Sequence, residues 1–148
     1  MNTEKVKQTA ENTSSLYNPG EALRAHGIYP TSQRKVIANI LLAKHQHLTA
    51  EQIYSAIRSK DSKVSQATIY NTLGLFVKKG LLREVFVDSS KTFYDTNTQA
   101  HHHFYNVDTG ELIDIQKHLE PSFTEHELPP ATQIDSVDII VRIKTYPA

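Results

Sequence analysis

Between residues 31 and 79, apolar side chains recur at intervals of three and four, the period of an α-helix with one buried face. Thr31, Thr49 and Ser65 stand where the three repeats of this pattern begin, and each is a residue type that commonly caps a helix N-terminus. Gln52 follows Thr49 by three positions, as in a capping box. A shorter helical stretch, 21–26, ends at Gly27. The pattern therefore predicts four helices before residue 80.

After Gly80 the helical period gives way to alternation of apolar and polar residues, which predicts strands. Residues 82–87 and 92–95 alternate in this way on either side of the polar turn 88–90. Helices followed by such a hairpin are the element order of a winged helix-turn-helix. The first half of the chain is therefore expected to bind DNA.

The remaining residues predict a different, smaller unit. Residues 101–107 and 111–115 flank an Asp-x-Gly turn at Asp108, which is typical of a β-hairpin. Residues 119–128 predict a short helix interrupted by Pro121, and the β-branched stretch 134–143 predicts a last strand. We therefore expect an α+β protein, in which the winged helix-turn-helix is followed by a small α/β domain.

Charge is distributed unevenly, although the net charge is zero. Residues 24–91 contain 11 Lys/Arg and 4 Asp/Glu, whereas residues 92–148 contain 3 and 9. A basic half suits the phosphates of nucleic acid, although chance clustering of surface charge gives the same count. The chain has no cysteine, which excludes disulfides and thiolate zinc sites. It has neither an apolar run of about 20 residues nor a signal-peptide pattern, so we expect a cytoplasmic protein that does not enter membranes.

The third long helix predicts the contact with DNA, because short polar side chains fill its first two turns. Such side chains reach base edges when a recognition helix enters the major groove. Basic residues at another helix start and in the hairpin would hold phosphates. An ordinary solvated helix face is the alternative. The predicted DNA-binding residues are Arg34, Ser65, Gln66, Thr68, Tyr70, Asn71 and Lys91.

Three consecutive histidines, His101 to His103, predict a metal site in the second unit. On a strand, His101 and His103 share one face and His102 lies on the other. Asp114, on the partner strand of the predicted hairpin, would approach the same face. Imidazole and carboxylate ligands suit Fe²⁺, Mn²⁺ or Zn²⁺. Asp95, just before the second unit, is a further candidate ligand. The alternatives are an exposed histidine patch for this run, a turn cap for Asp95 and a loop histidine for His47.

Taken together, these segments resemble the Fur (ferric uptake regulator) family. The matching stretches are T-S-Q-R at Thr31–Arg34, H-L-T-A-E-Q-I-Y at His47–Tyr54, V-S-Q-A-T-I-Y-N-T-L at Val64–Leu73, and the H-H-H-F-Y and G-E-L-I-D-I segments. Within the family, K-T-F-Y-D-T-N and V-D-I-I-V-R are similar to the iron response regulator (Irr) branch. The positions of the family's C-x-x-C motif hold Asn106 and Thr109, so no structural cysteine–zinc site is expected.

The resemblance implies a regulatory metal site made by His47, Asp95, His101, His103 and Asp114. It implies Fe²⁺ or Mn²⁺ in function and Zn²⁺ in vitro, with haem at the His triplet as an alternative. His102 is a possible haem ligand or a possible ligand of the family's second metal site. It also implies a homodimer that binds a palindromic operator in double-stranded DNA. The expected divisions are a flexible tail (1–15), a winged-helix DNA-binding domain (16–95), a hinge (96–100) and a metal-sensing dimerisation domain (101–148).

The function expected from these features is metal-responsive transcriptional regulation of iron homeostasis genes, with no enzyme activity. A peroxide-sensing regulator of the same family is the first alternative. A small non-haem iron enzyme is a weaker one, because five protein ligands would leave at most one open position on the metal. A third is a DNA-binding module in which the histidine cluster senses nothing.

Overall fold

The computed structural model describes residues 18–60 and 62–147. The tail predicted at 1–15 lies outside the described residues. The chain divides into two compact units, the first ending at Thr98 and the second beginning at Gln99. None of the described helices has the length and hydropathy needed to cross a bilayer.

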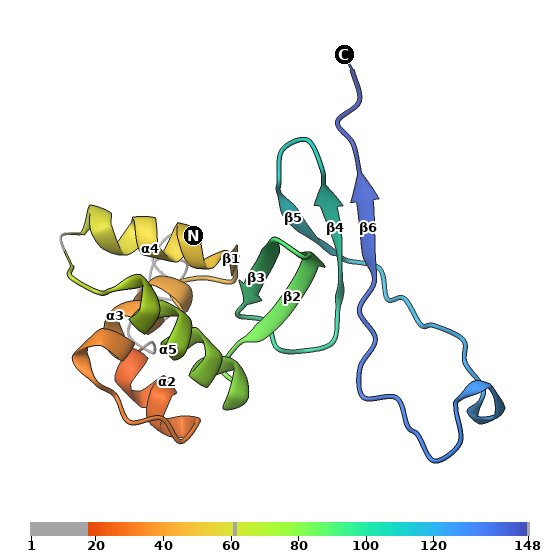
Figure 1. Ribbon diagram of the computed structural model, residues 1–148, viewed down its shortest axis with the longest axis horizontal. Helices are drawn as coiled ribbons and strands as arrows, with labels where there is room; N and C mark the ends of the chain where they lie inside the picture. Colours follow the sequence, from red (N-terminus) through yellow and green to blue (C-terminus); the bar gives the residue numbers. More distant parts are fainter. Residues whose placement is uncertain (1–17, 61, 148) are drawn as a thin grey trace, which may run out of the picture. The chain divides into compact units, whose positions relative to one another are not determined.

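Within the part of the chain that the structure describes, four helices and a small sheet form the first unit (Figure 1). The helices are α2 (Pro19–Ala25), α3 (Ser32–Leu41), α4 (Ala50–Ser59) and α5 (Gln66–Lys78). The strands β1 (His47–Leu48), β2 (Arg83–Asp88) and β3 (Lys91–Asp95) pair antiparallel in the order β1-β3-β2. The predicted helices and the β2–β3 hairpin are present. The sequence pattern did not predict β1, because residues 44–47 read as the fading end of a helix.

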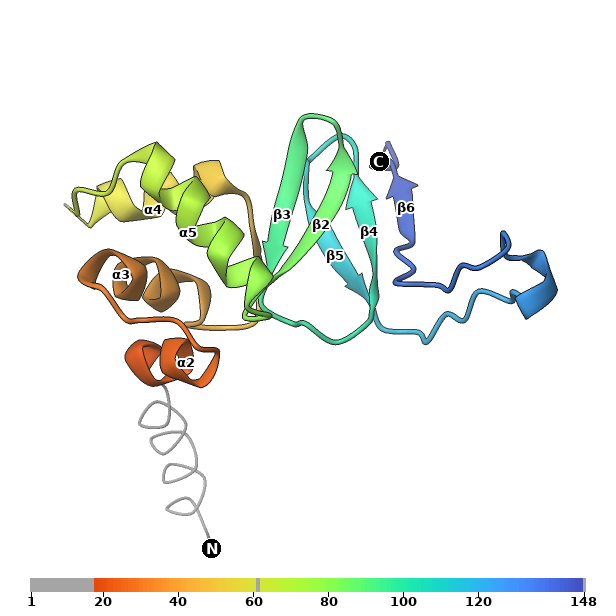
Figure 2. The ribbon, with the colours of Figure 1, turned by 60° about the horizontal axis from the view of Figure 1, so that its bottom comes forward.

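The apolar faces of the four helices enclose the core of this unit, and Figure 2 shows them grouped around α3 and α5. Phe76, Ile53 and Ile37 are fully buried there. Such close packing fixes the helices to one another and so sets the position of α5. The fully buried large side chains of the cluster are Leu23, Ile37, Leu41, Ile53, Ile57, Ile69, Leu73 and Phe76.

Helix α4 begins with a complete capping box. The Gln52 backbone N–H donates to the Thr49 hydroxyl at 3.2 Å, and the Thr49 backbone N–H donates to the Gln52 side-chain oxygen at 2.9 Å. Because Thr49 is itself buried, water cannot replace the lost partner. We expect Thr49→Ala to lower the free energy of unfolding by about 1 kcal/mol. Urea unfolding would check this, with the exposed Thr98→Ala expected to change little. Equal effects of the two substitutions would contradict it.

The second unit is built around a sheet ordered β5-β4-β6. Its strands are β4 (His102–Asn106), β5 (Leu112–Ile115) and β6 (Ile140–Ile143). Strands β4 and β5 form the predicted antiparallel hairpin, whose turn ends at Gly110 with a positive φ of 75°. Strand β6 pairs with β4 in parallel, which places the end of the chain on the opposite side of β4 from β5.

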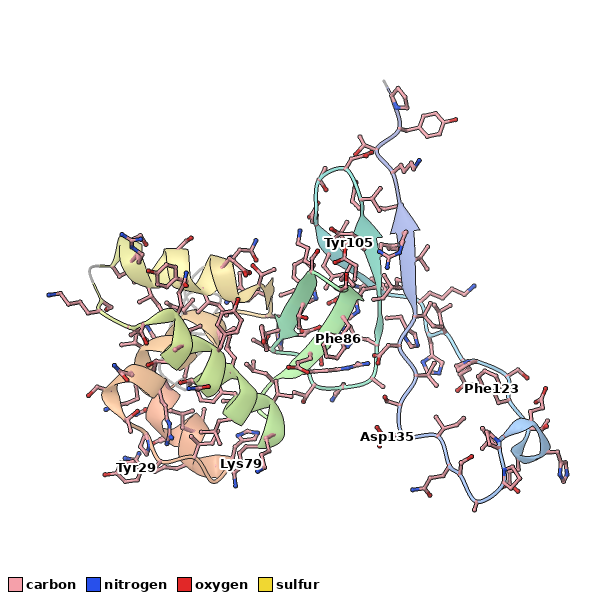
Figure 3. All side chains as sticks on the ribbon, in the orientation of Figure 1. Tyr29, Lys79, Phe86, Tyr105, Phe123 and Asp135 are labelled. Atoms are coloured by element: carbon pink, nitrogen blue, oxygen red, sulfur yellow. The ribbon has the colours of Figure 1, made fainter. Side chains whose placement is uncertain are left out.

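Two predictions for this unit are wrong. The helix expected at 119–128 is reduced to one 3-10 turn, η1 (Glu125–Glu127), and the last strand covers only residues 140–143 of the predicted 134–143. Pro121 hinders a helix, and apolar residues of the segment such as Phe123 and Ile134 are exposed. Figure 3 shows Phe123 pointing away from the chain. A helix without a buried face gains little from packing, which explains the extended course of the segment.

Candidate metal centre and nucleic-acid interface

In the first unit, His47 and Asp95 face each other across neighbouring strands. They are register partners in the β1–β3 pair, and His47 Nε2 lies 3.4 Å from Asp95 Oδ2. Gln46 fixes the start of β1, because its side-chain amide donates to the carbonyls of Ile40 and Leu41 at the end of α3. The Asn97 backbone N–H holds the other Asp95 oxygen at 2.9 Å. The pair is therefore positioned by the unit's own backbone.

In the second unit, His101 and His103 both reach Asp114. The Nε2 atoms of the two histidines each lie 3.3 Å from Asp114 Oδ1. Asp114 is the register partner of His103 across the β4–β5 hairpin, as expected from the sequence. The ligand atoms of these three residues lie within 4.8 Å of one another, and the His103 side chain is only 2% exposed. The fold thus gathers two imidazoles and one carboxylate on a rigid hairpin.

The orientation of His101 suits a cation. Its Nδ1 lies 2.6 Å from the Gln99 carbonyl, which only accepts, so this nitrogen carries a proton. In neutral His101 the Nε2 atom then has a bare lone pair, and it points at a carboxylate oxygen. Two acceptors face each other in this way when a proton or a metal ion lies between them. A ligating histidine usually donates its other N–H to a carbonyl in this manner.

His102 is oriented differently from its neighbours. It is buried, and its Nδ1 accepts the backbone N–H of Ile139 at 3.1 Å, just before β6. Neutral His102 therefore carries its proton on Nε2, which leaves no bare nitrogen for a metal or for haem iron. The cavity that His101 and His102 line measures 190 Å³, below the roughly 300 Å³ at which small-molecule pockets begin. His102 thus does not fit as a haem ligand, and its role is to join β4 to the chain before β6.

The predicted DNA-binding residues lie around α5, at the start of α3 and at the start of β3. Arg34, Thr68 and Asn71 line one groove of 320 Å³ between these two helices, together with Gln33, which the sequence pattern did not single out. Ser65 caps α5, and its hydroxyl donates to Thr68 Oγ1 at 2.9 Å. Gln66 is exposed at the N-terminal end of α5, whereas Lys91 Nζ lies over the Phe93 ring at 5.6 Å.

A residue of α4 that the sequence did not single out contacts α5, the predicted recognition helix. The Tyr70 hydroxyl donates to Glu51 Oε1 at 3.0 Å. The backbone N–H of Glu51 and the Tyr70 hydroxyl hold the pKa of the Glu51 carboxyl below its usual value. The same hydrogen bond raises the pKa of Tyr70. No local motif predicts the contact, because it depends on how α4 packs on α5.

Comparison with known proteins now decides the family. A model described as the ferric uptake regulator family matches residues 25–139. The chain belongs to this family. Its relatives carry the names of regulators, so the iron-enzyme alternative is set aside.

Two relatives are peroxide-responsive repressors named PerR. The protein from Staphylococcus aureus strain Mu50 is 37% identical over 95 residues, and that from Staphylococcus epidermidis is 37% identical over 94. The matched region spans 64% of this chain and 64% and 63% of those repressors, which is less than two thirds of their length.

Solved structures in the family share the fold. The ferric uptake regulator of Pseudomonas aeruginosa, determined with manganese, has a TM-score of 0.64 at 23% identity and covers 88% of this chain and 100% of its own. That of Vibrio cholerae has a TM-score of 0.66 at 22% identity and covers 86% of this chain and 100% of its own. A zinc-bound manganese uptake regulator has a TM-score of 0.64 at 21% identity and covers 88% of this chain and 100% of its own.

Proposed function

We propose that this chain is a cytoplasmic, homodimeric transcription regulator whose affinity for a DNA operator depends on a divalent metal ion. The main support is the trio of His101, His103 and Asp114, in which two imidazole nitrogens each lie 3.3 Å from one carboxylate oxygen, in a chain that belongs to the ferric uptake regulator family. Fe²⁺ and Mn²⁺ suit these nitrogen and oxygen donors. Zn²⁺ suits them equally well in vitro.

The ligand set we propose adds His47 and Asp95 to the trio, as the family resemblance implies. These two residues belong to the unit that carries α5, whereas the trio belongs to the other unit. A divalent ion carries positive charge, which attracts the nitrogen and oxygen ligand atoms of all five residues. Residues of both units binding one ion would fix the angle between them, and with it the spacing of the two recognition helices in a dimer. Metal would thereby be coupled to affinity for a palindrome.

For the genes under control, we propose those of iron homeostasis, as the similarity to the Irr branch implies. We do not extend this proposal to haem, because His102 lacks a bare nitrogen in this structure.

Peroxide sensing is the second candidate. The relatives named peroxide-responsive repressors favour it, as do the carboxylates of Asp95 and Asp114 beside the histidines. A gain in mass on His47 or His103 after peroxide treatment of the iron-loaded protein would support it. Unmodified histidines under those conditions would exclude it.

Fluorescence anisotropy on the chain's own upstream DNA at fixed salt tests the main proposal. We expect Mn²⁺ to tighten binding by about 5- to 150-fold over chelated protein, the usual range of coupling between two sites. A variant with both His101→Ala and His103→Ala should show no such gain. Equal binding with and without metal would refute the metal switch, and no preference over random DNA would refute the regulator itself.

A further inference from the structure

The Tyr70 hydroxyl donates its single proton to a hydrogen bond within the first unit. A phenol has one proton to donate, and this one points to Glu51 Oε1 at 3.0 Å. Glu51 is ionised at neutral pH and so offers acceptors only. The tyrosine is half exposed on the recognition helix and the glutamate is exposed at the start of α4. The unit thus presents a phenol oxygen and a carboxylate to solvent, neither with a hydrogen to give.

The surroundings hold this pair in place. Thr49 fixes the first turn of α4, in which Glu51 lies, through the capping box. The positive charge of Lys91, from the start of β3, also favours the ionised carboxylate. A cavity of 160 Å³ lies beside the pair, lined by Glu51, Tyr70, Gln66 and neighbouring side chains of α4 and α5. A base edge in the major groove could enter this space.

We propose that Glu51 is a specificity-determining residue, which orients Tyr70 and restricts its hydroxyl to accepting hydrogen bonds from DNA. This inference rests on the DNA-binding function proposed above. In the major groove only adenine N6 and cytosine N4 present amino donors, whereas guanine O6, guanine N7 and thymine O4 are acceptors. The Glu51–Tyr70 pair therefore selects an amino group and rejects an acceptor at its position in each half-site.

The negative charge of Glu51 adds to this selectivity. A carboxylate near DNA repels phosphates wherever the protein binds, whereas its effect on the Tyr70 hydroxyl is favourable only opposite an amino group. Glu51 thus weakens binding to random DNA more than binding to the operator. The measured quantity that isolates this effect is the ratio of the dissociation constants for random and operator DNA.

A double-mutant cycle in the metal-loaded full chain tests the inference. We expect Glu51→Ala and Tyr70→Phe each to lower the random-to-operator ratio by roughly tenfold, the size of one base contact. The double variant should lose little more, because both substitutions break one hydrogen bond. Glu51→Gln keeps an acceptor oxygen and should restore part of the ratio. The matched control is Glu21→Gln, which removes an exposed carboxylate of α2 and should leave the ratio unchanged.

Circular dichroism shows whether each variant is folded. Glu51→Ala should bind random DNA at least as tightly as the parent, which an unfolded protein would not do. If the parent protein prefers its operator and Glu51→Ala has the same random-to-operator ratio of dissociation constants, the inference is wrong and the proposed function still stands. A parent without preference would overturn both.

A second readout tests the polarity of the contact. Replacing individual adenines of the footprinted operator with purine, which lacks the N6 amino group, and cytosines with 2-pyrimidinone, which lacks N4, should weaken parent binding at one position per half-site. Tyr70→Phe should be insensitive to the replacement at that position. If no position behaves in this way, the hydroxyl does not read an amino group.

Discussion

Substituting His103 by alanine is expected to weaken Mn²⁺ binding by about 100-fold or more. Loss of a residue that merely supports a metal ligand typically costs 10- to 100-fold in affinity, so loss of a ligand should cost at least the upper end of that range. His103 is almost fully buried, and its Nε2 faces Asp114 at 3.3 Å. Asp114→Asn should give a similar loss, because the amide has the shape of the carboxylate without its charge.

Calorimetric titration with Mn²⁺ would measure these affinities. The matched control is His118→Ala in the same unit, where the histidine is 82% exposed and pairs with Glu120. This variant should bind Mn²⁺ as the parent does. Circular dichroism of each variant would separate loss of a ligand from loss of folding. Parent-like affinity in a folded His103→Ala protein would contradict the proposed metal site.

The largest expected effect on stability comes from Phe76 in α5. Its ring is fully buried in the core of the first unit, so Phe76→Ala removes a large apolar surface and leaves a cavity. Such substitutions cost about 3–5 kcal/mol. Domains of this kind are stable by only about 5–15 kcal/mol in total, so the recognition helix would lose much of its support.

Urea unfolding followed by the helical circular dichroism signal would check this prediction. All described α-helices belong to the first unit, so the signal reports that unit. The matched control is Phe123→Ala, which truncates a phenylalanine that is 59% exposed and should change the free energy of unfolding by less than about 0.5 kcal/mol. Similar midpoints for the two variants would show that Phe76 does not support the core as we describe.

Residues that lie close together along the chain were predictable from the sequence. Thr49 and Gln52 are three positions apart and form the expected box, and the period of apolar residues gave the helices. The hairpin turn at Gly110 likewise fixed the register that places His103 opposite Asp114. In each case residues that are near neighbours along the chain determine the geometry, so the helix start and the strand register can be predicted from the sequence alone.

Features that depend on packing between distant segments were not predictable. The residue pattern alone did not predict the pairing of His47 with Asp95, because it requires β1, a two-residue strand too short to show alternation. Only the family resemblance implied that the two residues share a site. The Tyr70–Glu51 bond joins two helices whose contact depends on the whole core. For the segment 119–128 the sequence predicted a helix that the structure lacks. Its residue pattern allows a helix, but the segment buries no face against the rest of its unit.

The two groups of proposed metal ligands differ in how they are assembled during synthesis. His103 and Asp114 lie on adjacent strands of one hairpin, which needs only local loop closure to form. His47 meets Asp95 only after α4, α5 and β2 have been made and packed, and β6 joins its sheet last of all. Because domains generally fold from the N-terminus as the chain emerges, a nascent chain would complete the unit that we propose to bind DNA before its second sheet. The proposed regulation by metal would therefore begin only after the first unit has formed, once the β4–β5 hairpin has brought His103 and Asp114 together.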